Sequence, residues 1–148
     1  MRRPTRNFQA VTFACDVMRR LIYISKSRIG PDPGALDAMV ARSDKLNNAA
    51  GITGMLWWDG ASFAQVLEGS HDAVERVFRR IQADPRHADL GIVFDRGVAG
   101  RLFGHWGMKR SDTSPEATAN TAFLIGLAAS DRSPSARRLF DVILACDG

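Results

Sequence analysis

Residues 52–69 read ITGMLWWDGASFAQVLEG and hold the clearest structural signal in the chain. Two runs rich in β-branched and aromatic residues, 52–58 and 61–68, flank the dipeptide Asp59-Gly60. An Asp-Gly pair between two such runs is typical of a β-hairpin, because glycine readily adopts the positive φ that a tight turn needs. We therefore predict two adjacent strands joined by a short turn.

Strands and helices alternate on either side of this hairpin. Leu21-Ile22-Tyr23-Ile24-Ser25 has the composition of a first strand, and further strands are predicted over 90–94 and 101–109. Apolar residues at helical spacing predict one helix from about Leu36 to Asn48 and a second between Ser70 and Asp84-Pro85. The order βαββαββ predicts an α+β, ferredoxin-like fold with a five-stranded mixed sheet and both helices on one face.

The last third of the chain predicts two more helices. Ser114-Pro115 and Ser133-Pro134 each place a capping residue before a first-turn proline. One face of the final helix carries Leu139, Val142, Ile143 and Cys146. These apolar side chains need a partner, so we expect the two helices to cover the second face of the sheet. We divide the chain into an extension expected to be disordered (1–17, with Met18 as an alternative start), a central domain (18–110) and a helical cap (111–148).

Composition narrows the class of protein. A length of 148 residues suits one domain, and no apolar run approaches the ~20 residues of a membrane-spanning helix. The net charge of +4 comes from five arginines among the first twenty residues, since residues 21–148 carry 15 basic and 15 acidic side chains. This balance predicts no nucleic-acid surface, and we expect no membrane partner either, since a long apolar run is missing. Two distant cysteines, Cys15 and Cys146, predict no disulfide framework and no metal site, and they suit the cytoplasm.

Polar side chains on apolar elements are the candidate functional residues. Period-two alternation places Gln65 on the same strand face as Phe63 and Leu67, where its amide must find hydrogen-bond partners. A structural network and the polar edge of a ligand would satisfy it equally well. Tyr23 lies in the middle of a buried strand, where it is either a core aromatic residue or part of such a site. Asn47, Arg86 and His87 stand at helix ends, where capping or solvation would also explain them.

Five motifs nevertheless occur together in a characteristic order. They are Tyr23-x-Ser25, Asn47-Asn48-x-x-Gly51-Ile52-Thr53-Gly54, Phe63-x-Gln65-Val66-Leu67-Glu68-Gly69, Asp84-x-Arg86-His87 and Trp106-x-Met108. With these spacings, residues 19–110 resemble the BLUF family of flavin-binding blue-light sensors. The resemblance implies the fold predicted above, with a flavin held between the two helices and against the sheet. It implies FAD as cofactor, with FMN or riboflavin as possible substitutes.

The resemblance also implies roles for individual residues. Tyr23 matches the tyrosine that donates an electron to the excited flavin, and Gln65 matches the glutamine between that tyrosine and the N5/C4-carbonyl edge of the ring. Asn47 matches an asparagine at the same edge. The remaining matches are Ser43 and Ile81 on helix positions facing the ring, Arg86 and His87 beside it, and Trp106 and Met108 as the pair linked to signalling.

Some positions depart from the family pattern. Lys45 and Leu46 replace more polar or arginine residues, and Trp57-Trp58 could offer a competing electron donor. We expect a sensor rather than an enzyme, which signals to a separate protein partner or through self-association. The alternative is a ferredoxin-like hydrolase of the acylphosphatase type, which would use Asn47 and an arginine around a phosphate. The sequence lacks the glycine-rich phosphate loop that this alternative needs after the first strand.

Overall fold

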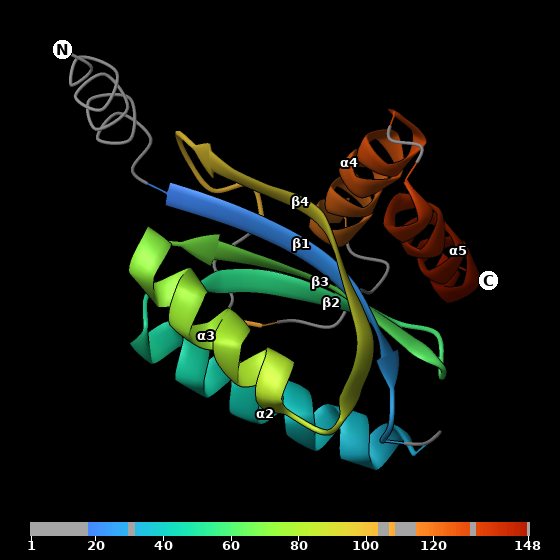
Figure 1. The fold of residues 1–148 in the computed structure, drawn as a ribbon, viewed down its shortest axis with the longest axis horizontal. Helices are drawn as coiled ribbons and strands as arrows, with labels where there is room; N and C mark the ends of the chain where they lie inside the picture. The colour runs from blue at the N-terminus through green and yellow to red at the C-terminus, as the bar shows by residue number, and fades with distance from the viewer. Residues whose placement is uncertain (1–17, 30–31, 104–106, 109–114, 131–132, 148) are drawn as a thin grey trace, which may run out of the picture.

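The computed structural model describes residues 18–29, 32–103, 107–108, 115–130 and 133–147. Within these residues the chain forms an α+β fold built on one sheet (Figure 1). The strands are β1 (Met18–Ser27), β2 (Thr53–Trp58), β3 (Ser62–Gly69) and β4 (His87–Val98). Their order across the sheet is β2-β3-β1-β4.

The predicted hairpin joins β2 and β3. Gly60 has a φ of +96°, which glycine adopts without steric cost. The side chain of Asp59 accepts hydrogen bonds from the backbone N–H groups of Ala61 at 2.9 Å and Ser62 at 2.7 Å. The turn is therefore stabilised by the two residues that predicted it.

The sheet differs from the prediction in two ways, the first being its direction. Each neighbouring pair, β2 with β3, β3 with β1 and β1 with β4, is antiparallel, so the mixed sheet was wrong. The reason is topological. The helical crossovers make β1 parallel to β2 and β3 parallel to β4, but another strand lies between the members of each parallel pair.

The second difference is the number of strands, since the described residues form four and not five. Of the predicted strand at 101–109, the described residues 101–103 and 107–108 belong to no strand. The backbone N–H groups of Leu102 and Phe103 donate to the carboxylate of Glu68 at 3.0 Å instead of to a neighbouring strand. A buried side chain thus takes the hydrogen bonds that strand pairing would have used.

Helices α2 (Pro33–Ala49) and α3 (His71–Ala83) cover one face of the sheet (Figure 1). Asp32 and Ser70 cap their N-termini by accepting hydrogen bonds from Gly34 at 2.9 Å and Ala73 at 3.2 Å. The core on this face joins sheet and helix side chains: Leu21, Tyr23, Leu36, Met39, Ile52, Leu56, Phe63, Leu67, Ala73, Val74, Val77, Phe78 and Met108. We call these residues the α2/α3-side core.

Helices α4 (Pro115–Ser130) and α5 (Pro134–Asp147) cover the opposite face, which confirms the expected position of the C-terminal helices (Figure 1). The core on this face contains Ile22, Ile24, Met55, Trp57, Ala64, Val66, Phe103, Leu124, Leu139, Val142 and Ile143. The side chain of Cys146 and the extension 1–17 lie outside the described residues. The division into 1–17, 18–110 and 111–148 stays a prediction. No helix in the described part of the chain is long and apolar enough to cross a membrane.

Two leucines of α5 provide a matched test of how far this second core stabilises the protein. Leu139 is fully buried, whereas Leu144 is 49% exposed. Leu139→Ala should lower the free energy of unfolding by about 2–5 kcal/mol, because it leaves a cavity in a packed core. Leu144→Ala, the same chemical change in the same helix, should alter it by less than about 0.5 kcal/mol. Denaturant unfolding measures both, and equal losses would show that α5 does not pack on the sheet as described.

Candidate functional site

Tyr23 and Gln65 are direct neighbours across the centre of the sheet. They are paired in the register of β1 and β3, so both side chains point to the face covered by α2 and α3. Tyr23 is fully buried and Gln65 is 7% exposed. The phenol of Tyr23 donates a hydrogen bond to Oε1 of Gln65. The two residues that sequence analysis singled out are therefore in direct contact.

The other end of the Gln65 amide contacts Met108. Its Nε2 donates to Sδ of Met108 over 3.4 Å, and Met108 is itself buried. This contact orients the amide, because the opposite rotamer would set the carbonyl oxygen against a sulfur that has no hydrogen to donate. Tyr23, Gln65 and Met108 form a chain of three groups, which we call the Tyr–Gln–Met chain.

The Tyr23 phenol stays protonated across the physiological range. Burial raises its pKa far above the usual value, and the nearby negative charge of Asp84 raises it further. The ring also packs against Phe78, with centroids 5.8 Å apart. Tyr23 is consequently a neutral, fixed donor that holds one proton on the Gln65 side.

Two residues in the C-terminal half of α2 bond the segment that carries Met108. Asn47 donates from Nδ2 to the carbonyl of Gly107 at 2.9 Å, and Met108 donates its N–H to Oδ1 of Asp44 at 2.9 Å. Gly107 packs so closely that a Cβ there would collide with the backbone oxygen of Asp44. Asn47 is thus more than a helix-ending residue, and sequence analysis missed Asp44 because nothing in its spacing points to residue 108.

His87 lies on the same side of the sheet, at the start of β4. A hydrogen bond of 2.8 Å joins its Nδ1 to the hydroxyl of Ser25, and its ring packs against Phe63 at 4.9 Å between centroids. Burial lowers the pKa of His87, and Arg86 lowers it further while Asp84 opposes both. The imidazole is therefore mainly neutral at pH 7. The Ser25 contact explains the serine in the motif Tyr23-x-Ser25.

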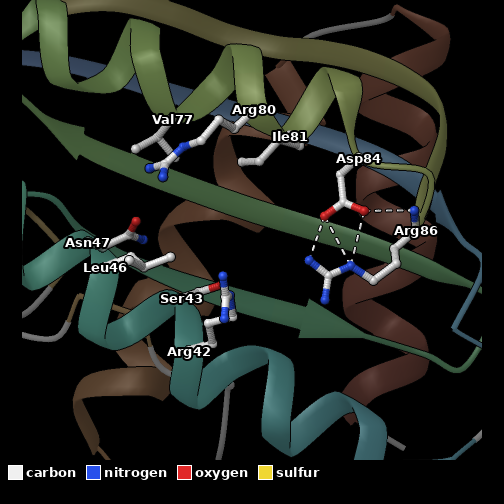
Figure 2. A pocket seen from close by; sticks show the side chains of 9 residues that line it. All are labelled: Arg42, Ser43, Leu46, Asn47, Val77, Arg80, Ile81, Asp84 and Arg86. Atoms are coloured by element: carbon white, nitrogen blue, oxygen red, sulfur yellow. Dashed lines mark hydrogen bonds and ion pairs between the residues drawn. The ribbon is translucent and has the colours of Figure 1, made fainter.

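A cleft of about 200 Å³ opens between α2 and α3 (Figure 2). Its lining residues are Arg42, Ser43, Leu46, Asn47, Val77, Arg80, Ile81, Asp84 and Arg86. Four of the predicted cofactor-binding residues, Ser43, Asn47, Ile81 and Arg86, are in this set. Of the others, Arg42, Leu46, Val77 and Arg80 recur at helical spacing on the same faces, so periodicity could have found them, and Asp84 is the C-cap of α3.

The remaining predicted residues lie below or beyond the cleft. Tyr23, Gln65 and His87 do not line it. Val77 belongs to both the cleft lining and the α2/α3-side core, and that core also contains Tyr23 and Met108. Met108 belongs to that core, whereas Trp106 lies outside the described residues.

At one end of the cleft Asp84 neutralises Arg86. The Asp84 carboxylate accepts from the backbone N–H of Arg86 at 2.9 Å and from its guanidinium at 2.6–3.0 Å (Figure 2). This partner holds the pKa of Asp84 below its usual value. Among the described residues, no group of three or more His, Cys, Asp or Glu side chains could hold a metal ion.

Comparison with known proteins places this geometry in a family. Residues 18–109 match the family model for BLUF, described as sensors of blue-light using FAD. A relative in Euglena longa, photoactivated adenylate cyclase subunit beta, is 34% identical over 96 residues, which make up 64% of this chain. The chain spans only 11% of the length of that relative.

Two solved structures show the same architecture. The dark-state structure of BlrB, a BLUF protein, is 27% identical with a TM-score of 0.62, over 90% of this chain and 99% of its own. The structure of Klebsiella pneumoniae BlrP1 with FMN and cyclic diGMP is 41% identical with a TM-score of 0.59, over 64% of this chain and 26% of its own. The family match covers well over half of the chain, and it includes every motif quoted above. The chain belongs to the BLUF family of flavin-dependent blue-light sensors.

Proposed function

We propose that this protein senses blue light through a flavin in the α2/α3 cleft, and that Tyr23 and Gln65 convert absorption into a rearranged hydrogen-bond network. The observation that carries the proposal is the buried Tyr–Gln–Met chain. A structural role alone would explain a satisfied glutamine, but it would not require a tyrosine, an amide and a thioether in series. The family match favours this function over the hydrolase alternative.

The residues of the cleft fit a flavin ring. Leu46, Val77 and Ile81 supply apolar walls for a planar heterocycle. Asn47 is buried at the inner side, and among the described residues its side chain makes one hydrogen bond, from Nδ2 to Gly107. Its oxygen and second N–H remain for the polar edge of the ring. Ring stacking with apolar contact on two sides and amide groups at one edge is what such a ligand needs.

The chemistry on the protein side begins at the phenol. A bound flavin supplies a chromophore that absorbs blue light and accepts an electron when excited. Tyr23 can release an electron together with its proton, since its neighbour Gln65 already accepts a hydrogen bond from that hydroxyl. A change at the phenol removes the donor that holds Oε1 of Gln65 in place. The amide can then rotate or tautomerise, because its two ends differ in hydrogen-bonding character.

Output is part of the same proposal. Rearrangement of Gln65 would weaken or remove the hydrogen bond from its Nε2 to Met108. Met108 bonds Asp44 of α2 through its N–H, and the neighbouring Gly107 accepts a hydrogen bond from Asn47 of the same helix. We infer that the protein signals without an enzymatic step of its own, to a partner protein or through self-association. Support comes from BlrB, a BLUF protein that this chain covers over 99% of its length.

Two substitutions separate flavin binding from switching. Tyr23→Phe keeps the ring and its packing against Phe78 but removes the hydroxyl, and Gln65→Leu keeps volume but removes the amide. We expect blue light to cause a small red shift in the wild type, because a rearranged Gln65 amide would donate more strongly to the flavin carbonyl. Both variants should retain bound flavin and the normal dark spectrum, and both should lose this shift. Absorption spectra before and after illumination measure this.

Trp58→Phe is the control for a competing electron donor. Trp58 packs against the α2/α3-side core, whereas Trp57 lies on the other face and bonds Thr121 at 3.0 Å. The red shift should survive Trp58→Phe. A full, reversible red shift in Tyr23→Phe at the wild-type rate would refute Tyr23 as the donor.

A further prediction concerns Asp44 as the residue that positions Met108. Asp44→Ala removes a charged acceptor, a hydrogen bond worth about 1.5–3 kcal/mol. Exchange of the Met108 amide proton with solvent should therefore become on the order of tenfold faster or more. Asp44→Asn keeps an acceptor oxygen and should lose less protection.

Amide exchange followed by NMR reads this out directly, with Ile22 in the central strand as an internal reference. Exchange at Ile22 should not change in either variant. If the Met108 amide exchanges at the wild-type rate in Asp44→Ala, then Asp44 does not hold that segment.

A further inference from the structure

Glu68 is a buried carboxylate that the proposed photochemistry does not use. It lies on β3 three residues after Gln65, so strand alternation puts the two side chains on opposite faces of the sheet. Glu68 is fully buried. Its two oxygens accept hydrogen bonds from the backbone N–H groups of Leu102 and Phe103 at 3.0 Å and from Nε of Arg20 at 2.6 Å.

Stability alone does not explain a buried ion pair at this position. Burying two charges costs desolvation that apolar side chains of similar volume would avoid. An apolar side chain could not, however, accept the hydrogen bonds of Leu102 and Phe103. The guanidinium of Arg20 adds a hydrogen bond to the carbonyl of Gly100 at 3.2 Å. The Arg20–Glu68 pair therefore holds the chain directly after β4 by its backbone.

The same stretch of chain leads to Met108. Met108 follows Phe103 by five residues, and an extended chain of that length spans at most about 18 Å. The position of Phe103 therefore restricts the position of Met108. Met108 in turn accepts a hydrogen bond from Nε2 of Gln65 over 3.4 Å. A thioether is a weak acceptor, so this contact depends on how well Met108 is held in place.

We propose that Glu68 is a positioning residue for the light response, because it holds the chain after β4 and thereby keeps Met108 against Gln65. This inference rests on the proposed function. In the present arrangement Nε2 of Gln65 donates to Met108. A fixed Met108 offers this bond as soon as a rearranged amide turns back, whereas a mobile Met108 offers it only part of the time. Loss of the Glu68 contacts should therefore slow the return of the amide after illumination.

Glu68→Gln tests the proposal first in the dark. Glutamine keeps the size of the side chain but has one acceptor oxygen, and its amide hydrogens oppose the N–H groups that face it. Phe103 still packs against Trp57 and Phe123, at 6.4 Å and 6.0 Å between ring centroids, so the variant should fold. Amide exchange measured by NMR should become faster at Phe103. It should also become about threefold or more faster at Met108, although Glu68 makes no hydrogen bond to Met108 in the described structure.

The light response supplies the second measurement. After illumination of the flavin-loaded full chain, the red-shifted absorption should decay about threefold or more slowly in Glu68→Gln than in the wild type. The dark spectrum should not change. Met108→Leu removes the thioether, so adding Glu68→Gln to it should cause no further slowing, because residues that act through one contact are not additive. Additive slowing would indicate a general loosening of the fold and would overturn the inference.

Arg101→Gln is a second variant that loosens the same stretch of chain from the solvent side. Arg101 is exposed, and its guanidinium donates to the carbonyls of Gly51 at 2.7 Å and Glu68 at 2.9 Å. Its loss should slow the decay in the same direction as Glu68→Gln. Because no buried charge is disturbed, this variant keeps the proposal testable even where Glu68→Gln does not fold.

Glu75→Gln is the matched control. Glu75 of α3 pairs at 2.7 Å with Arg19, the neighbour of Arg20 in β1, and it makes no hydrogen bond to the described residues after β4. It should change neither the decay nor the exchange at Met108, and an equal slowing there would overturn the inference. A wild-type or faster decay in Glu68→Gln, or in Arg101→Gln where the first variant does not fold, would also overturn it and leave the proposed function standing. A wild type without any light-induced red shift would refute the proposed function itself.

Discussion

A glutamine amide in the middle of a buried sheet imposes the constraint on which the rest of the site depends. Gln65 needs an acceptor and a donor inside an apolar core, and leaving either end unpaired would cost about 1–3 kcal/mol. Tyr23 on the next strand supplies the donor and Met108 the acceptor. The thioether is a weak acceptor, so the amide is satisfied unequally at its two ends. A strong partner on one side and a weak one on the other make this amide easier to reorient than a fully bonded one.

The contact between Met108 and Gln65 requires the chain after β4 to pass from one face of the sheet to the other. Phe103 packs in the core under α4 and α5, whereas Met108 packs on the other face. The chain changes faces within five residues. Glu68 anchors the start of this passage by accepting from Leu102 and Phe103 and pairing with Arg20 at 2.6 Å. A buried ion pair is costly by itself, and the backbone hydrogen bonds that Glu68 also accepts offset part of that cost.

Local signals in the sequence were enough for most of the fold. Asp59-Gly60 predicts its turn because the glycine and the aspartate act within four residues, and the same holds for Ser70 at the start of α3. The predicted fifth strand was wrong because the backbone of Leu102 bonds the side chain of Glu68, which lies 34 residues away in the sequence. A local sequence pattern cannot reveal such a contact. Tyr23 and Gln65 could be found from alternation and from resemblance to a family. Asp44 could not, since its bond to Met108 joins residues 64 apart in the chain.

The Tyr–Gln–Met chain and the cleft between α2 and α3 differ in the charges that their residues carry. Tyr23 and His87 are mainly neutral at pH 7, because burial raises the pKa of Tyr23 and lowers that of His87. Formal charges lie at the cleft, where Asp84 pairs with Arg86 and where Arg42 and Arg80 have no carboxylate partner in the described structure. Of these charged groups, Asp84 raises the pKa of Tyr23, and its ion pair with Arg86 offsets part of that effect. The Asp84–Arg86 ion pair therefore links the residues that line the cleft to the phenol at which the proposed photochemistry begins.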